Sequence, residues 1–255
     1  MKNIILTIVA ALAVNFSALA ANIGIESGTS YTTSTWVNGV SSSVGQWFLP
    51  ADLGAKYAIA NSTQGGRTSI GDNAFFLAPG TGDWNRYAKA YFVFGGGALS
   101  AGQSLSFDTN FLWNGGRRGF QLQNDGGTVN LLGVKHEWAD PLVAYNGGLS
   151  GDTSLLANAY QKAVRFSASV ATGDVVSWSI SDLSNSSTLR SGSFTGSVAQ
   201  LYFYSGDNTD TANQDNFGMF VNNINIVPEP SSSLLMGLGL AGLAVLRLRR
   251  VRKTV

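Results

Sequence analysis

Two alternating runs decide the fold: Lys162-Ala-Val-Arg-Phe-Ser-Ala-Ser-Val170 and Val175-Val-Ser-Trp-Ser-Ile180. In each run every second residue is apolar. Because successive side chains of a strand point to opposite faces, a period of two is typical of a half-buried β-strand. The intervening Ala171-Thr172-Gly173-Asp174 supplies turn residues. The two runs therefore predict a β-hairpin.

The same alternation recurs along the chain, with glycine pairs and triplets between the runs. Further strands are predicted at 87–94, 103–108, 120–123, 200–204 and 217–226. Many short strands separated by turn residues favour an all-β, antiparallel, jelly-roll-like β-sandwich, formed by residues 21–226 as one domain. Only residues 155–163 could be helical, and they lack a convincing N-cap, so a loop stays open there. Trp36 and Trp178 are expected in the core.

The N-terminal end carries a hydrophobic segment that the sandwich does not need. Residues 1–20 combine one cation, Lys2, with an apolar run from Ile4 to Val14 and small residues at Ala18 and Ala20. These are the three parts of a secretory signal peptide, and we expect signal peptidase to cut after Ala20. The chain has no cysteine, so the exported body must be stabilised by its core and not by disulfides.

The C-terminal end combines a short motif, an apolar run and a basic tail. Val227-Pro228-Glu229-Pro230 comes first, followed by the apolar span 231–246 and the tail 247–255, which holds five cations. The span is short against the roughly 20 residues that cross a bilayer, but snorkelling of the first arginine closes part of the gap. We expect a transmembrane helix whose cations stay in the cytoplasm.

This order of Pro-Glu-Pro motif, apolar span and arginine-rich tail resembles the PEP-CTERM sorting signal, over residues 227–255. The resemblance implies that Pro228, Glu229 and Pro230 are the sorting residues and that the membrane protease exosortase removes the tail. It also implies transient insertion in the inner membrane, then delivery to the cell surface or extracellular matrix of a Gram-negative bacterium, in association with exopolysaccharide and biofilm. Residues 162–226 resemble the closing strands of concanavalin-like and laminin-G-like jelly rolls, which in bacterial envelopes often bind glycans.

The charge of the body argues against polyanionic partners. Residues 21–230 hold all fifteen acidic side chains but ten of the sixteen cations, which gives them a net charge of −5, although the whole chain is +1. An acidic body has no electrostatic reason to bind nucleic acid or an anionic polysaccharide. We therefore expect no nucleic-acid partner.

Residues suited to catalysis are sparse. The chain has three glutamates, of which Glu229 belongs to the sorting motif, and it has no Glu-x-Asp-x-x-Glu strand of the kind found in jelly-roll glucanases. The sole histidine, His136, has no Gly-x-Ser-x-Gly elbow to accompany it, and one histidine without cysteine cannot form a usual zinc site. We expect a non-enzymatic protein in which His136 is an exposed loop residue.

Three tryptophans near turns have polar neighbours: Trp84, Trp113 and Trp138. Their flat rings could stack on sugar rings, and burial or edge packing stays open for each of them. Arg117 and Arg118 could bind a carboxylate or form a solvated turn.

An Asp/Asn-rich stretch offers oxygen ligands from three aspartates, Asp207, Asp210 and Asp215. Hard carboxylate and amide oxygens in a short stretch suit calcium, the one cofactor that the sequence allows. The alternative is an ordinary turn between strands, because these residues also favour turns.

The sequence thus predicts an exported, exosortase-processed surface or matrix protein that binds exopolysaccharide without catalysis. A structural or adhesive envelope protein without a glycan site is the alternative, and a glycan-active enzyme is the third hypothesis. Aromatic residues gathered on one sheet face would favour the first hypothesis over the second.

Overall fold

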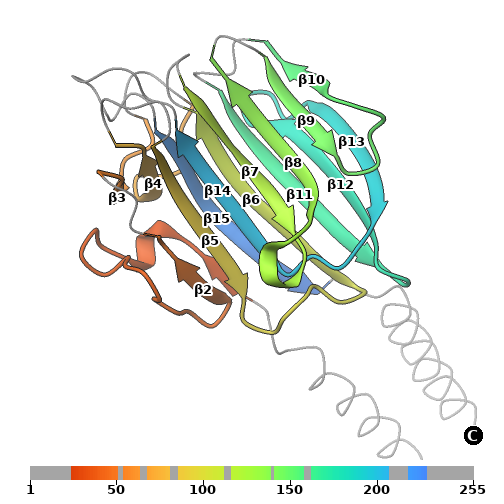
Figure 1. Cartoon of the computed structure of the whole chain (residues 1–255), viewed down its shortest axis with the longest axis horizontal. Coiled ribbons are helices and arrows are strands. Elements are labelled where there is room, and N and C mark those ends of the chain that lie inside the picture. Colours follow the sequence, from red (N-terminus) through yellow and green to blue (C-terminus); the bar gives the residue numbers. More distant parts are fainter. Residues whose placement is uncertain are drawn as a thin grey trace, which may run out of the picture.

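Two antiparallel β-sheets pack face to face in the computed structural model of the chain (Figure 1). The structure describes residues 24–50, 54–63, 68–80, 86–111, 116–138, 141–157, 162–206 and 218–228. The spatial order of sheet A is β13 (Thr188–Thr195), β12 (Val175–Asp182), β11 (Ala163–Ala171), β6 (Gln103–Phe111), β15 (Met219–Pro228), β4 (Ala74–Ala78) and β3 (Lys56–Ala60), and β1 (Gly24–Glu26) also pairs with β15. The order of sheet B is β10 (Thr153–Leu156), β9 (Leu142–Asn146), β8 (Asn130–Glu137), β7 (Arg117–Gln123), β14 (Gln200–Gly206), β5 (Tyr87–Phe94) and β2 (Gly45–Phe48).

The predicted all-β antiparallel sandwich is confirmed. The quoted hairpin is β11 and β12, paired from Ala171 opposite Val175 to Val164 opposite Asp182. Gly173 and Asp174 in its turn have positive φ angles of 78° and 56°, the backbone region that glycine and aspartate tolerate best. Two short 3₁₀ turns, η1 (Gly28–Ser30) and η2 (Asp125–Gly127), complete the described elements.

The helix considered over residues 155–163 is wrong where the structure describes that segment. Leu155 and Leu156 belong to β10, which pairs with β9, and Ala163 already begins β11. The two leucines are half-buried against the core, so pairing and packing at the sheet edge decide their conformation over helix propensity.

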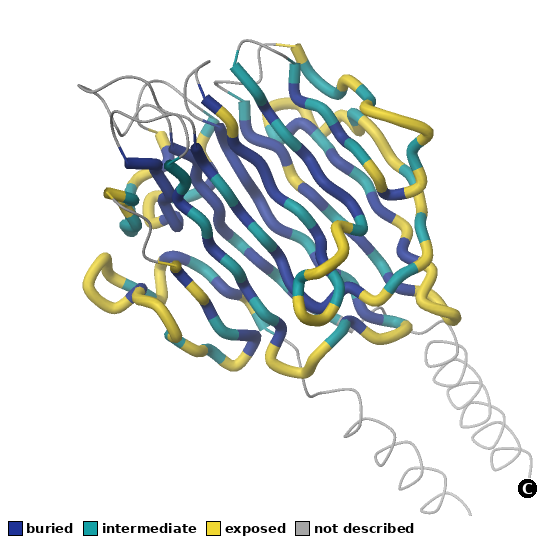
Figure 2. Tube along the Cα trace, in the orientation of Figure 1, coloured by how far each residue is buried: buried dark blue, intermediate teal, exposed yellow. Residues whose placement is uncertain are grey.

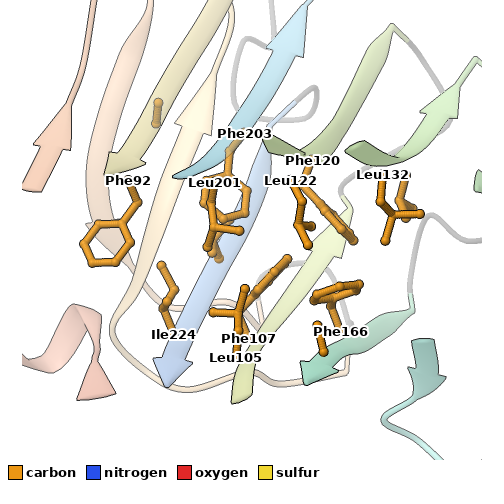
Figure 3. Close-up of a cluster of buried hydrophobic side chains, with 14 of the residues drawn as sticks. Phe92, Leu105, Phe107, Phe120, Leu122, Leu132, Phe166, Leu201, Phe203 and Ile224 are labelled. Atoms are coloured by element: carbon orange, nitrogen blue, oxygen red, sulfur yellow. The ribbon is translucent and has the colours of Figure 1, made fainter. Parts of the chain in front are cut away.

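The core lies between the sheets and is rich in phenylalanine. Side chains from sheet B point toward those of sheet A in Figure 3, and buried residues alternate with less buried ones along strands such as β5 and β12 in Figure 2. Phe107 of β6 is central: its ring centroid lies 4.8 Å from that of Phe120 and 5.4 Å from that of Phe203, both edge-on, which joins the two sheets. Trp36 and Trp178 are buried, as predicted, and the indole of Trp178 donates to the carbonyl of Gly147 at 2.8 Å.

Strand β15 brings the two ends of the described chain together. Its last residue, Pro228, lies opposite Gln103 of β6, and Ile226 lies opposite Gly24 of β1. We call this end of the sandwich the motif end, because the Pro-Glu-Pro motif begins there. β1 is anchored by Glu26, whose buried carboxylate accepts a hydrogen bond from the indole of Trp47 at 2.8 Å.

The predicted signal peptide (residues 1–20), the predicted transmembrane span (231–246) and the basic tail (247–255) lie outside the described residues. Among the residues that the structure does describe, no helix combines the length and apolarity needed to span a bilayer.

Candidate functional site

The solvent side of sheet B carries an unusual number of tyrosines. In β5 and β14 the side chains alternate between buried and half-buried, so that Ala, Phe and Leu point inward while tyrosines point outward. The outward tyrosines on these two strands are Tyr87, Tyr91, Tyr202 and Tyr204. The alternation predicted from the sequence therefore builds both the core and this surface.

Strand register aligns several of these side chains across the sheet. Phe48 lies opposite Tyr91, and Tyr91 lies opposite Tyr202. The same line continues across β7 and β8 to Tyr145 of β9 by way of Gln121 and Gly133. We call this line the tyrosine row: Phe48, Tyr91, Tyr202, Gln121, Gly133 and Tyr145. Five strand spacings of about 4.8 Å give it a length of about 24 Å.

Glycines allow the tyrosine rings to lie against the backbone. A Cβ on Gly133 would collide with the ring of Tyr145, and a Cβ on Gly206 would collide with the ring of Tyr87. Because each glycine lacks that atom, the neighbouring ring occupies the space directly above the strand. The rings are consequently part of the sheet surface.

The central rings also stack on one another. The centroids of Tyr91 and Tyr202 lie 4.7 Å apart with an interplanar angle of 24°, and those of Tyr202 and Tyr204 lie 5.5 Å apart at 22°. Burial raises the pKa of all three hydroxyl groups above that of free tyrosine. These groups are therefore protonated at neutral pH and remain hydrogen-bond donors.

A chain of amide hydrogen bonds fixes the polar part of the same face. Gln200 donates to Gln123 at 2.7 Å, Gln123 donates to Gln121 at 2.9 Å, and Gln121 donates to the hydroxyl of Tyr145 at 2.8 Å. Each amide thus has a defined orientation beside the aromatic rings. Flat apolar faces next to fixed amides suit a ligand that has both C–H faces and hydroxyl groups, as sugars do.

A small hollow lies at the β9 end of the tyrosine row. It has a volume of about 290 Å³ and is lined by Lys135, Glu137, Pro141, Val143 and Asp152. The Lys135 ammonium lies 3.1 Å from Asp152, 3.7 Å from Glu137 and 5.7 Å from the centroid of the Tyr145 ring. The hydrogen bond to Asp152 contributes most to a raised Lys135 pKa, so this cation persists at neutral pH.

Over β6, β11, β12 and β13 the outer face of sheet A is different, because serines replace the aromatics. Register aligns two lines of four serines across β6, β11, β12 and β13: Ser106, Ser167, Ser179, Ser191 and Ser104, Ser169, Ser177, Ser193. A shallow hollow of about 500 Å³ lies over part of this area. Short hydroxyl side chains offer hydrogen bonds but no stacking surface, which makes this face a useful control for the tyrosine row.

The structure places only some of the predicted site residues. Trp138 is half-buried directly after β8, and Pro228 ends β15. The other residues proposed for sugars, calcium and sorting lie outside the described residues: Trp84, Trp113, Asp207, Asp210, Asp215, Glu229 and Pro230. No cluster of three or more potential metal ligands occurs among the described side chains.

The prediction that His136 is an exposed loop residue is wrong. His136 lies in β8 with its ring fully buried, and its centroid lies 6.1 Å from that of Phe111. Burial, assisted by the charge of Arg118, lowers the His136 pKa from 6.5 to about 4. The solvated turn considered for the arginine pair is wrong for Arg118, which is fully buried in β7, while Arg117 is exposed.

The tyrosine row was not predicted, although the sequence already indicated two of the strands that form it. The runs 87–94 and 200–204 were identified as strands, and in each of them two tyrosines lie in phase opposite to the buried apolar residues. The missing information was the register between strands more than a hundred positions apart, which joins separate tyrosines into one line.

Comparison with known structures agrees with a sandwich of the jelly-roll class. A sialidase matches with a TM-score of 0.54 and 12% identity over 83% of this chain, which spans only 19% of the sialidase. A structure reported with endo-acting O-glycanases of the human gut microbiota has a TM-score of 0.48 and 10% identity, covering 82% of this chain and 100% of the other. An endo-β-1,4-glucuronan lyase from the fungus Trichoderma reesei has a TM-score of 0.44 and 9% identity, covering 71% and 90%. At such identities the likeness concerns the fold alone.

The family comparison gives the more particular result. Residues 227–250 match the PEP-CTERM protein-sorting motif, as the resemblance had implied. The chain is therefore an exported protein that exosortase processes. No curated protein sequence matches the chain significantly.

Proposed function

We propose that this chain is a cell-surface or extracellular-matrix protein of a Gram-negative bacterium that binds exopolysaccharide through the tyrosine row, without catalysis. The observation that carries the proposal is the register that aligns Phe48, Tyr91, Tyr202 and Tyr145 across sheet B. A row about 24 Å long fits an extended polymer better than a single sugar. The sorting motif supports a location where such polymers occur.

The charge pattern favours a weakly charged or neutral polysaccharide. The rings and amides of the row are uncharged at neutral pH, and the residues from 21 to 230 carry a net charge of −5. A polyanion would be repelled by the body as a whole. Hydrogen bonds to hydroxyls and stacking on C–H faces supply the remaining interactions.

The test is binding of purified mature protein to the extracellular polysaccharide of the cells that produce it, measured by isothermal titration. Tyr202→Ala is expected to weaken binding about tenfold or more, because it removes the ring that stacks on both Tyr91 and Tyr204. A tenfold loss of affinity corresponds to about 1.4 kcal/mol of binding free energy. Tyr202→Phe keeps the ring and is expected to retain most of the affinity. Ser179→Ala, on the outer face of sheet A, is the matched control.

Two outcomes would contradict the proposal. Absence of binding by the wild-type protein would favour the structural or adhesive alternative, for which the serine face of sheet A is the candidate contact surface. Shortening of the polysaccharide, followed by the release of reducing or unsaturated ends, would establish the enzyme hypothesis. The two carboxylates beside the tyrosine row, Glu137 and Asp152, both contact the Lys135 ammonium, an arrangement that we interpret as structural.

A further inference from the structure

We infer that exosortase cuts a folded substrate, in which pairing of β1 with β15 already holds the start of the sorting motif, Val227 and Pro228, at the membrane-facing end of the sandwich. This inference rests on the processing indicated by the sorting motif, and it concerns how that motif is presented. Its first support is that no linker separates the motif from the fold. Val227 and Pro228 are both motif residues and members of β15, opposite Ser104 and Gln103 of β6.

The strand that carries the motif is held on both sides. β6 pairs with β15 along one edge, while β4 and β1 pair with successive parts of the other edge. Ile224 and Ile226, which precede the motif directly, are fully buried in the core. Pulling this part of β15 out for a protease would expose two isoleucines and break two ladders, so the folded arrangement resists it.

Strand β1 completes this end of the sheet. Gly24 lies opposite Ile226, and a Cβ on Gly24 would collide with the side chain of Val44, so the strand fits closely into its place. The hydrogen bond from Trp47 to Glu26 fixes the other end of β1 to the core. Gly24 lies four positions after Ala20, where we expect signal peptidase to cut. Both processed ends of the chain therefore leave the body on neighbouring strands.

The length of chain between the body and the membrane segment is short. Five residues, 229–233, separate Pro228 from Leu234, where the unbroken apolar part of the span 231–246 begins after three serines. Even fully extended, this connection spans at most about 20 Å. A body folded while the run is inserted thus keeps the motif end close to the lipid surface, where a membrane protease acts.

Two strand connections lie at the motif end. β5 joins β6 through residues 95–102, Gly-Gly-Gly-Ala-Leu-Ser-Ala-Gly, and β13 joins β14 through residues 196–199, Gly-Ser-Val-Ala. Both contain small or apolar uncharged side chains. These two connections therefore add no charged side chain at the motif end.

A disulfide across β1 and β15 tests the inference directly, because the chain has no cysteine of its own. Ile25 and Asn225 lie directly opposite each other, and Ile25 is 63% exposed, so Ile25→Cys with Asn225→Cys perturbs the core little. Ser177→Cys with Ser193→Cys, a directly opposite pair on β12 and β13, is the matched control. The single-cysteine variants control for substitution alone.

The variants are exported in cells with and without exosortase, and the precursor and product are separated by mass. We expect the β1–β15 disulfide to form in the uncut precursor when exosortase is absent, and we expect the crosslinked precursor to be cut as fast as its reduced form when exosortase is present. Two results would overturn the inference. The first is a precursor in which the control disulfide forms but the β1–β15 disulfide does not. The second is accumulation of uncut β1–β15-crosslinked precursor while the crosslinked control is processed. Failure of exosortase to cut even the wild-type chain would overturn the processing assignment itself, and the inference with it.

Discussion

Protonation of His136 is expected to destabilise the fold as the pH falls. In the folded protein its pKa is lowered from 6.5 to about 4, because the ring is buried and lies near the charge of Arg118. Between these two values the unfolded chain binds a proton that the folded chain does not, so stability is fully present above pH 6.5 and decreases as the pH falls toward 4. Neither ring nitrogen has a hydrogen-bond partner among the described residues, so no acceptor compensates the charged form.

The expected size follows from the two pKa values. The full shift corresponds to about 3 kcal/mol, of which about 2 kcal/mol is lost between pH 7 and pH 5. The assay is urea unfolding of the mature protein at both pH values, compared with His136→Phe, which keeps a ring beside Phe111 but cannot titrate. Subtracting the two profiles removes the contribution of the carboxylates.

The sole histidine also gives one imidazole signal, whose NMR titration reads the pKa directly. Titration near 6.5 in the folded protein, or identical pH profiles for the wild type and His136→Phe, would refute the reasoning.

Two further predictions concern the core and the tyrosine row. Phe107→Ala should lower the free energy of unfolding by about 3–5 kcal/mol, because its ring joins the two sheets. Phe48→Ala, at the exposed end of the row, should lower it by less than about 1 kcal/mol. Equal effects of the two substitutions in urea unfolding would contradict this description of the core. Gly133→Ala should displace the Tyr145 ring, lower the free energy of unfolding by about 1–3 kcal/mol and weaken polysaccharide binding. Gly151→Ala, where a Cβ meets open space, should change the free energy of unfolding by no more than about 0.5 kcal/mol. Unchanged stability and binding of Gly133→Ala would show that the position of the ring does not depend on the glycine.

Much of the fold could be predicted because local alternation and tertiary structure agree. The hairpin of β11 and β12 is an example: its apolar face, its turn and its register follow from adjacent residues. The helix considered over 155–163 failed because sheet-edge pairing, a distant interaction, decides the conformation of Leu155 and Leu156.

The buried position of His136 could have been predicted from the sequence. It is in phase with Leu132 and Val134, both inward in β8, so the period of two places it in the core. Its charged neighbours, Lys135 and Glu137, occupy the outward positions of the same strand. The tyrosine row could not have been assembled from the sequence alone, because β14 joins β5 to β7 by a register that only the folded sheet defines.

The glycines beneath the tyrosine rings have a consequence for the thermodynamics of recognition. The rings that lie over glycines and the stacked rings of Tyr91 and Tyr202 both have few rotamers to lose, and the linked glutamines are oriented before any partner arrives. Because this surface is already ordered, its side chains lose little conformational entropy when a partner binds. The affinity of this face for a partner would then depend on how well the partner's shape matches a surface that does not adjust. Rigid polymers with a regular repeat are the molecules best able to match it.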